Sequence, residues 1–175
     1  MISRSIFLVG PMGAGKSTIG KLLAAQLRLP FADSDKVLEE KTGADIPWIF
    51  DVEGEAGFRR RESDVLSQLC AGPVQVIATG GGIVLKEENR LLLRKHGLVV
   101  YLQASIDQLL ERTSKNSNRP LLQVPDPRAR IVELVNERDP LYREVADLVC
   151  ETDHCTPKQA ATRVAERLTE TDTAG

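Results

Sequence analysis

Short apolar runs alternate with amphipathic segments along most of this chain. The apolar runs are rich in leucine or β-branched residues, are bounded by Gly, Pro or Asp, and predict strands buried on both faces. They lie at residues 6–9, 30–32, 74–78, 98–102 and 148–150. The segments between them repeat their apolar residues at helical spacing and predict helices at 16–27, 34–42, 55–70, 86–95, 105–114, 127–146 and 156–168.

Alternating strands and helices predict an α/β fold in three layers, with a five-stranded parallel sheet flanked by helices. Two segments interrupt the alternation. The connection after residue 32 is too long for a simple crossover, so we expect a helical insertion that binds substrate at 33–61. Residues 112–127 are rich in Ser, Asn and Pro, which is typical of a lid or a binding loop. We expect a single domain at 1–170 and a flexible tail at 171–175.

Composition excludes several classes of function. The chain has 175 residues, with 23 Lys and Arg against 25 Asp and Glu, and a formal net charge of −2. A protein that binds nucleic acid through its phosphates should carry a basic excess, so we expect no nucleic-acid partner. The charge-free, glycine-rich segment 72–85 is too short to span a bilayer, so we expect no membrane partner either.

The cysteines favour a reducing compartment. Cys70, Cys150 and Cys155 are odd in number and form no CxxC pair, so we expect unpaired thiols and a cytoplasmic protein. His96 and His154 lie far apart and fit no zinc spacing. Because no unexplained apolar stripe indicates a subunit interface, we expect a monomer.

The segment from Gly10 to Ser17 carries the clearest chemical signal. It matches the pattern GxxxxGK[ST] directly after a predicted strand and at the start of a predicted helix, which is the context of a P-loop. Its glycines let backbone N–H groups turn toward an anion, Lys16 would reach the outer phosphates, and the Ser17 hydroxyl would bind Mg²⁺. The motif predicts a P-loop NTPase fold that binds a nucleoside triphosphate. A kinase, an ATPase and a nucleotide sensor stay open, whereas a switch GTPase needs an NKxD motif that the chain lacks.

Two carboxylates follow the second predicted strand. In many P-loop proteins a strand such as 74–78 ends in an Asp that supports magnesium, but here it ends in Thr79 and three glycines. Asp33 is the natural substitute and would hold Mg²⁺ through its water shell. Asp35 would then lie near the γ-phosphate and contact an acceptor hydroxyl, or would be an acid in the first turn of a helix.

Glycines and arginines supply the remaining candidates, and each has an alternative interpretation. Gly80–Gly82 would let the backbone approach a ligand at the sheet edge where ligands bind in such folds, or would form a plain turn. Arg119 would stabilise a transferring phosphoryl group, or would be a surface arginine. Arg59–Arg61 would form a salt-bridged, solvent-facing helix surface, and no spacing assigns Arg138 to a site.

Taken in order, these segments resemble the shikimate kinase family across nearly the whole chain. The matching motifs are GPMGAGKST at 10–18, FADSD at 31–35, GFRRRE at 57–62, TGGG at 79–82, RPLL at 119–122 and RDPLYREVA at 138–146. A P-loop alone recurs in many families, but this ordered set is specific. One departure is Arg61, where related sequences often carry an apolar residue, and it could alter the packing of its helix.

The resemblance implies transfer of the γ-phosphoryl group of ATP to the 3-hydroxyl of shikimate, in chorismate biosynthesis, with Mg²⁺ as cofactor. It implies catalytic roles for Lys16, Asp35 and Arg119, with Asp35 orienting the attacking hydroxyl or accepting its proton. Ser17 would bind Mg²⁺ directly and Asp33 through water. The implied ATP contacts are Gly13, Ala14, Gly15, Lys16, Ser17, Thr18, Arg112, Arg119 and Pro157. The implied shikimate contacts are Asp35, Arg59, Gly80, Gly81, Gly82 and Arg138, with the two arginines holding the carboxylate.

Two other hypotheses stay open. Another small-molecule kinase of the same fold, such as a gluconate kinase or a nucleoside monophosphate kinase, would share the P-loop. A gluconate kinase should nevertheless lack the carboxylate clamp of Arg59 with Arg138. A nucleotide-binding module that has lost phosphotransfer should lack at least one of Lys16, Asp35 and Arg119, and all three are present.

Overall fold

The computed structural model of this chain describes residues 1–115 and 124–174. Its centre is a five-stranded sheet in the order β2-β3-β1-β4-β5, in which every neighbouring pair is parallel. The strands are β1 (Ser5–Val9), β2 (Phe31–Asp33), β3 (Val76–Ala78), β4 (Gly97–Gln103) and β5 (Leu148–Glu151). Each strand coincides with a predicted apolar run to within a few residues, so the predicted five-stranded parallel α/β fold is confirmed.

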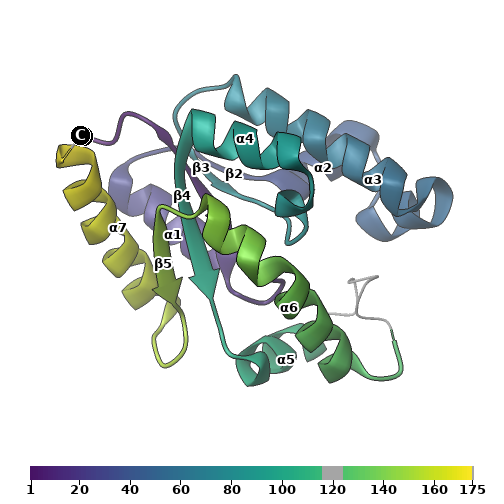
Figure 1. Cartoon of the computed structure of the whole chain (residues 1–175). Coiled ribbons are helices and arrows are strands. Elements are labelled where there is room, and N and C mark those ends of the chain that lie inside the picture. Colours follow the sequence, from purple (N-terminus) through teal and green to yellow (C-terminus); the bar gives the residue numbers. More distant parts are fainter. Residues whose placement is uncertain (116–123, 175) are drawn as a thin grey trace.

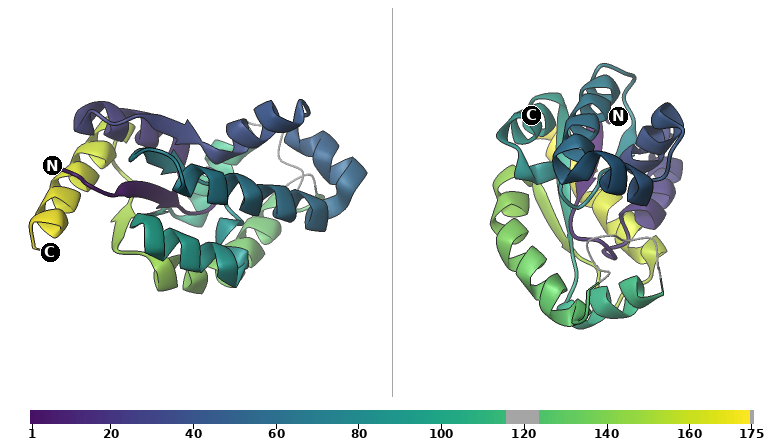
Figure 2. Two further views of the ribbon diagram at one scale, coloured as in Figure 1. Left: turned by 90° about the horizontal axis from the view of Figure 1, so that it is seen from above. Right: turned by 90° about the vertical axis from the view of Figure 1, so that its right-hand side faces the viewer.

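Helices cover both faces of this sheet (Figure 1 and the right-hand view of Figure 2). They are α1 (Lys16–Leu27), α2 (Ser34–Thr42), α3 (Ile46–Cys70), α4 (Glu87–His96), α5 (Ile106–Ser114), α6 (Pro127–Val145) and α7 (Pro157–Thr173), with a short 3₁₀ turn η1 (Ile83–Leu85) after β3. Within β1, Ile6 and Leu8 pack into the core shared with α1 and α7, whereas Phe7 and Val9 pack into the core shared with α4 and α6. Because both faces are covered, the strand is apolar at successive positions.

Helix α3 differs most from its prediction. It begins at Ile46 rather than at residue 55, and the Asp45 side chain caps it by accepting from Trp48 N–H. The helix bends at Gly54, whose φ of 71° lies in the left-handed region that glycine adopts readily. The part before the bend lacks the regular apolar spacing of the part after it, which is why the pattern predicted only the second part.

Helices α2 and α3 form the helical insertion that the long connection predicted. They enclose a small core of their own, made of Leu38, Ile49, Phe58 and Val65. The left-hand view of Figure 2 shows this unit projecting beyond the sheet, at the end of the molecule opposite the two termini. The insertion is therefore placed to cover one side of the sheet edge where the P-loop lies.

Helix α7 is longer than predicted. It continues to Thr173, so the first residues of the expected flexible tail are helical. The hydroxyls of Thr169, Thr171 and Thr173 each donate to a carbonyl four residues earlier, and they are thereby accommodated within the helix.

The segment expected to act as a lid, 112–127, is described only at its two ends. Arg119 lies outside the described residues, together with the rest of 116–123. Among the helices in the described ranges, none combines the length and apolar character that a membrane span requires.

Candidate active site

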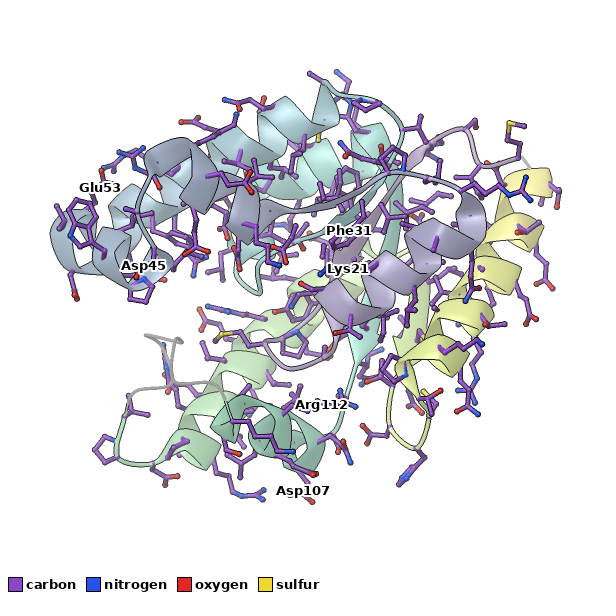
Figure 3. The ribbon with its side chains drawn as sticks, turned by 180° about the vertical axis from the view of Figure 1, so that it is seen from behind. Lys21, Phe31, Asp45, Glu53, Asp107 and Arg112 are labelled. Atoms are coloured by element: carbon purple, nitrogen blue, oxygen red, sulfur yellow. The ribbon has the colours of Figure 1, made fainter. Side chains whose placement is uncertain are left out.

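The carboxyl ends of β1, β2 and β3 meet at one edge of the sheet and carry most of the predicted site residues. The P-loop follows β1, Asp33 ends β2, and the glycine segment follows β3. A cavity of about 650 Å³ opens at this edge. Its lining is Met12, Gly13, Gly15, Lys16, Ser17, Thr18, Asp33, Asp35, Lys36, Glu39, Asp45, Ile46, Pro47, Thr79, Gly80, Gly81 and Arg112. Figure 3 shows Asp45, before α3, well separated from Arg112 on α5, so the insertion and α5 supply opposite parts of the lining.

The P-loop has the geometry of an anion cradle. Gly13 and Gly15 have φ values of 85° and 94°, which glycine adopts without a steric cost. Gly15 is the N-cap of α1 and offers no side chain to the first N–H groups of the helix, which leaves them for an anion. Lys16 Nζ donates to Gly10 O at 2.5 Å and to Pro11 O at 3.0 Å, so its ammonium group is folded over the loop.

Ser17 and Asp33 bring two oxygen ligands together beside this cradle. The Ser17 hydroxyl donates to Asp33 Oδ2 at 2.5 Å. The other oxygen of Asp33 caps α2 by accepting from Asp35 N–H at 3.0 Å and from Lys36 N–H at 3.4 Å. A hydroxyl and a carboxylate are the hard oxygen ligands that Mg²⁺ prefers, with water and phosphate completing its shell. The described residues contain no cluster of three or more His, Cys, Asp or Glu that would bind a metal without such help.

The glycine segment is packed directly against charged side chains. A Cβ atom on Gly80 would lie 2.8 Å from Glu62 Oε2 and 3.0 Å from Asp35 Oδ1. A Cβ atom on Gly82 would overlap the guanidinium group of Arg59, and one on Gly81 would lie 3.5 Å from Arg138 Nη1. The missing side chains therefore allow two carboxylates and two guanidinium groups to surround one stretch of backbone. This brings Asp35, Arg59 and Arg138 together from three different helices.

The Arg59 side chain is buried, which contradicts the expectation that it lies on a solvent-facing helix surface. Its Nη1 donates to Glu62 Oε1 at 2.9 Å and its Nη2 to Glu55 Oε1 at 3.3 Å. Arg61 does match that expectation, because it is exposed and pairs through two hydrogen bonds, at 2.6 and 2.7 Å, with Glu53. That ion pair spans the Gly54 bend, so the unusual Arg61 joins the two parts of α3 and leaves the buried face unchanged.

Glu62 is the least expected charge in the site. It is 2 % exposed, and burial raises the pKa of its carboxyl despite the opposing effect of Arg59, while the nearby Asp35 raises it further. Among the buried polar atoms of the described residues, Arg59 Nε, Glu62 Oε2 and Arg138 Nε have no hydrogen-bond partner. Buried polar groups are normally satisfied, so this cluster has the unmet hydrogen-bonding capacity of a site for a polar ligand.

Arg112 connects the P-loop to the loop after β5. Its Nη1 donates to Gly13 O at 2.9 Å and to Thr152 Oγ1 at 3.4 Å. That loop ends at Thr156, which caps α7 through a capping box, and Pro157 is the first residue of the helix. Arg112 thus lies beside the P-loop and lines the cavity, while Pro157 is outside the lining.

The predicted site residues that the structure describes divide into three groups. Gly13, Gly15–Thr18, Asp33, Asp35, Gly80, Gly81 and Arg112 line the cavity. Ala14, Arg59, Gly82 and Arg138 are buried behind that lining, and Pro157 lies beyond it. Arg119 lies outside the described residues.

Sequence reasoning missed two buried residues that contact the site, Glu62 and Tyr142. Both fall inside motifs that carried the resemblance, 57–62 and 138–146, but neither motif alone indicates what the residue contacts. It also missed five residues of the insertion that line the cavity. These are Lys36, Glu39, Asp45, Ile46 and Pro47.

Known proteins resemble this chain in both sequence and fold. A protein-family model described as shikimate kinase matches residues 12–169. A shikimate kinase of Pseudomonas paraeruginosa is 57% identical over 164 residues, which cover 94% of this chain and 95% of the relative. The solved structure of a shikimate kinase from Acinetobacter baumannii in complex with shikimate is 46% identical, with a TM-score of 0.94 over 96% of this chain and 94% of that one.

A gluconokinase from Sinorhizobium meliloti shares the fold alone. It is 15% identical, with a TM-score of 0.54 over 97% of this chain and 98% of that one. The similarity to gluconate kinases that the P-loop suggested thus stops at the architecture. Since the family model covers most of the chain and a relative is 57% identical over 94% of it, this protein belongs to the shikimate kinase family of ATP-dependent phosphotransferases.

Proposed function

We propose that this protein transfers the γ-phosphoryl group of ATP to the 3-hydroxyl of shikimate, giving shikimate 3-phosphate and ADP. The observation that carries the proposal is the meeting of Asp35, Arg59 and Arg138 around Gly80–Gly82, beside the P-loop. Two guanidinium groups suit a carboxylate, and a third, acidic group suits a hydroxyl. The A. baumannii relative that is 46% identical was solved with shikimate bound, which supports the same acceptor here.

On the nucleotide side, the first N–H groups of α1 and the backbone of Gly13–Gly15 hold the phosphates, and Thr18 lies beside them in the first turn of the helix. Ala14 belongs to the same loop. Lys16 leaves its carbonyl partners on the loop and turns toward the β- and γ-phosphates. Arg112 and Pro157 contact the adenine side of ATP.

Ser17 and Asp33 would hold Mg²⁺, Asp33 through water. Their 2.5 Å contact supports this role, because it keeps both oxygens at one point beside the phosphate cradle. When bound, the ion neutralises phosphate charge and orients the γ-phosphate. Asp33 itself is held at the start of α2, because one of its oxygens accepts two backbone N–H groups.

On the acceptor side, Arg59 and Arg138 bind the carboxylate of shikimate, and the backbone of Gly80–Gly82 binds a hydroxyl. Asp35 orients the 3-hydroxyl toward the γ-phosphate and accepts its proton as the new bond forms. Phosphoryl transfer has a loose transition state, so alignment by Asp35 contributes more than its basicity. Arg119, with the 112–127 segment as a lid, would stabilise the charge on the transferring group and exclude water.

A coupled assay of ADP release tests the proposal. With ATP and Mg²⁺ present, shikimate, gluconate and several nucleoside monophosphates are offered separately as acceptors. We expect turnover with shikimate alone. Turnover with gluconate or a nucleotide instead of shikimate would refute the proposal.

We also propose that the protein is a cytoplasmic monomer. The free thiols of Cys70, Cys150 and Cys155 support the cytoplasmic location.

A further inference from the structure

The hydroxyl of Tyr142 lies directly behind the glycine segment. Tyr142, on α6, is fully buried, and its hydroxyl donates a hydrogen bond of 2.5 Å to Gly81 O. The same hydroxyl interacts with the guanidinium group of Arg138, four residues earlier on the helix. One phenolic oxygen therefore interacts with both the glycine backbone and Arg138. In the proposed function the glycine backbone binds a hydroxyl of shikimate, and Arg138 belongs to the clamp that binds its carboxylate.

This phenol is built to act as a donor. Burial raises the pKa of Tyr142, although Arg138 opposes the effect, so the hydroxyl keeps its proton at neutral pH. The ring is held by Tyr101, whose centroid lies 4.9 Å away and whose own hydroxyl donates to Asp139 Oδ1 at 2.7 Å. A buried phenolic hydroxyl usually finds a hydrogen-bond partner, and here the acceptor of its proton is the Gly81 carbonyl.

The glycine segment needs such an anchor. Three successive residues without Cβ have more backbone freedom than any others. The segment is tied at its start by the Thr79 hydroxyl, which donates to Leu8 O at 2.7 Å, and at its middle by Tyr142. Because a trans peptide is planar, fixing the Gly81 carbonyl also fixes the N–H of Gly82, which points away from Tyr142.

We propose that Tyr142 is a positioning residue for shikimate, whose hydroxyl holds both the Gly81–Gly82 peptide and the Arg138 guanidinium in the orientations that bind the substrate. The inference rests on the proposed function. Tyr142 does not touch shikimate itself; it acts through the two groups that do. Removal of the Tyr142 hydroxyl therefore weakens binding of shikimate and leaves binding of ATP unchanged.

The variant Tyr142→Phe removes one oxygen atom and keeps the ring. Tyr101→Phe is the matched control, because it removes the hydroxyl of the neighbouring ring while Asp139 keeps its 2.9 Å ion pair with Arg143. We expect KM for shikimate to rise about fivefold to tenfold in Tyr142→Phe, the range for losing one buried hydrogen bond. We expect kcat and KM for ATP to stay at the native values, and Tyr101→Phe to behave as the native enzyme.

The outcomes separate the inference from the proposed function. A native enzyme that does not phosphorylate shikimate refutes the proposed function. If the native enzyme does phosphorylate shikimate, two results overturn the positioning role alone. One is a KM for shikimate that is unchanged in Tyr142→Phe, and the other is a KM that rises equally in Tyr142→Phe and Tyr101→Phe.

A second measurement keeps the hydroxyl in place and so does not depend on the stability of Tyr142→Phe. The chain contains two tyrosines, so 3-fluorotyrosine incorporated into Tyr101→Phe labels position 142 alone. We expect the ¹⁹F resonance to shift when shikimate saturates the enzyme without nucleotide. A resonance that does not move at saturation overturns the proposal.

Discussion

The hydroxyl of Ser17 donates a hydrogen bond of 2.5 Å to Oδ2 of Asp33. This contact joins the first turn of α1 to the end of β2, and so links the phosphate cradle to the acceptor side of the site. The second oxygen of Asp33 accepts the N–H of Asp35 at 3.0 Å. The residue that we propose to hold Mg²⁺ thus also places the residue that we propose to orient the acceptor hydroxyl.

Replacing Asp33 by Asn separates its two roles. Asparagine caps a helix as well as aspartate does, so we expect α2 and the melting temperature to be retained. The lost charge weakens Mg²⁺ binding, and we expect the Mg²⁺ concentration for half-maximal activity to rise about tenfold or more. Activity is measured as a function of Mg²⁺ concentration, with melting curves in parallel. An unchanged Mg²⁺ dependence would remove Asp33 from the metal site.

Asp35→Asn tests the acceptor side. The amide can still accept a hydrogen bond from the 3-hydroxyl but cannot accept its proton, so we expect kcat to fall. Because we propose that alignment contributes more than basicity, we expect this loss to be smaller than the roughly hundredfold that full general base catalysis contributes. Calorimetry should give the native dissociation constant for ATP.

Asp45→Asn is the matched control for Asp35→Asn. It removes a negative charge from the same cavity while the asparagine still caps α3. We expect near-native kcat for this control. Loss of ATP binding in Asp35→Asn, or equal losses of kcat in both variants, would count against the acceptor role.

Gly82→Ala and Gly81→Ala form a graded pair. The backbone of Gly82, with φ −95°, accepts alanine, but the added methyl group would overlap the Arg59 guanidinium. At Gly81 the methyl group would meet Arg138 Nη1 at an ordinary contact distance of 3.5 Å. We therefore expect KM for shikimate to rise more in Gly82→Ala than in Gly81→Ala. Equal values in the two variants would show that the position of Arg59 does not matter for the acceptor.

Glu62 predicts a pH dependence of stability. Its pKa is raised in the folded protein above the ordinary value of 4.5, mainly by burial. A carboxyl of this kind stabilises the fold most below pH 4.5, and the contribution is lost as pH rises through the raised value. Glu62→Gln stays neutral, so we expect the free energy of unfolding of the native protein to fall relative to that of the variant as pH rises above 4.5.

Denaturant unfolding between acidic and neutral pH measures this difference. The matched control is Glu55→Gln, which removes the other carboxylate paired with Arg59 but at a side chain that is 53% exposed. For Glu55→Gln we expect the difference in free energy of unfolding from the native protein to change little with pH, because water screens an exposed ion pair. A difference between native protein and Glu62→Gln that is constant with pH would contradict the raised pKa.

Local patterns in the sequence were sufficient for the sheet and the nucleotide side. The P-loop is a contiguous motif, and Asp33 follows a strand whose carboxyl end must lie at the same edge, so these patterns alone place Lys16, Ser17 and Asp33 together. The acceptor side could not be derived in this way. Arg59 and Arg138 reach the glycine segment only because α3 and α6 pack beside it, and no spacing along the chain encodes that packing.

The missed features have the same cause. Glu62 and Tyr142 contact Gly80 and Gly81 across the fold, so each looks like an ordinary helix residue in the sequence. The early start of α3 was hidden because Gly54 interrupts the helical pattern, and a glycine at that place is as consistent with a loop as with a bend.

The most direct test of the account is identification of the product by ³¹P NMR after incubation with ATP, Mg²⁺ and shikimate. Phosphoryl transfer to the acceptor predicts ADP together with one phosphate monoester resonance coupled to the proton on C3 of shikimate. ADP with inorganic phosphate in place of the ester, or an ester at another hydroxyl, would contradict the proposed arrangement of Asp35, Arg59 and Arg138 around the acceptor.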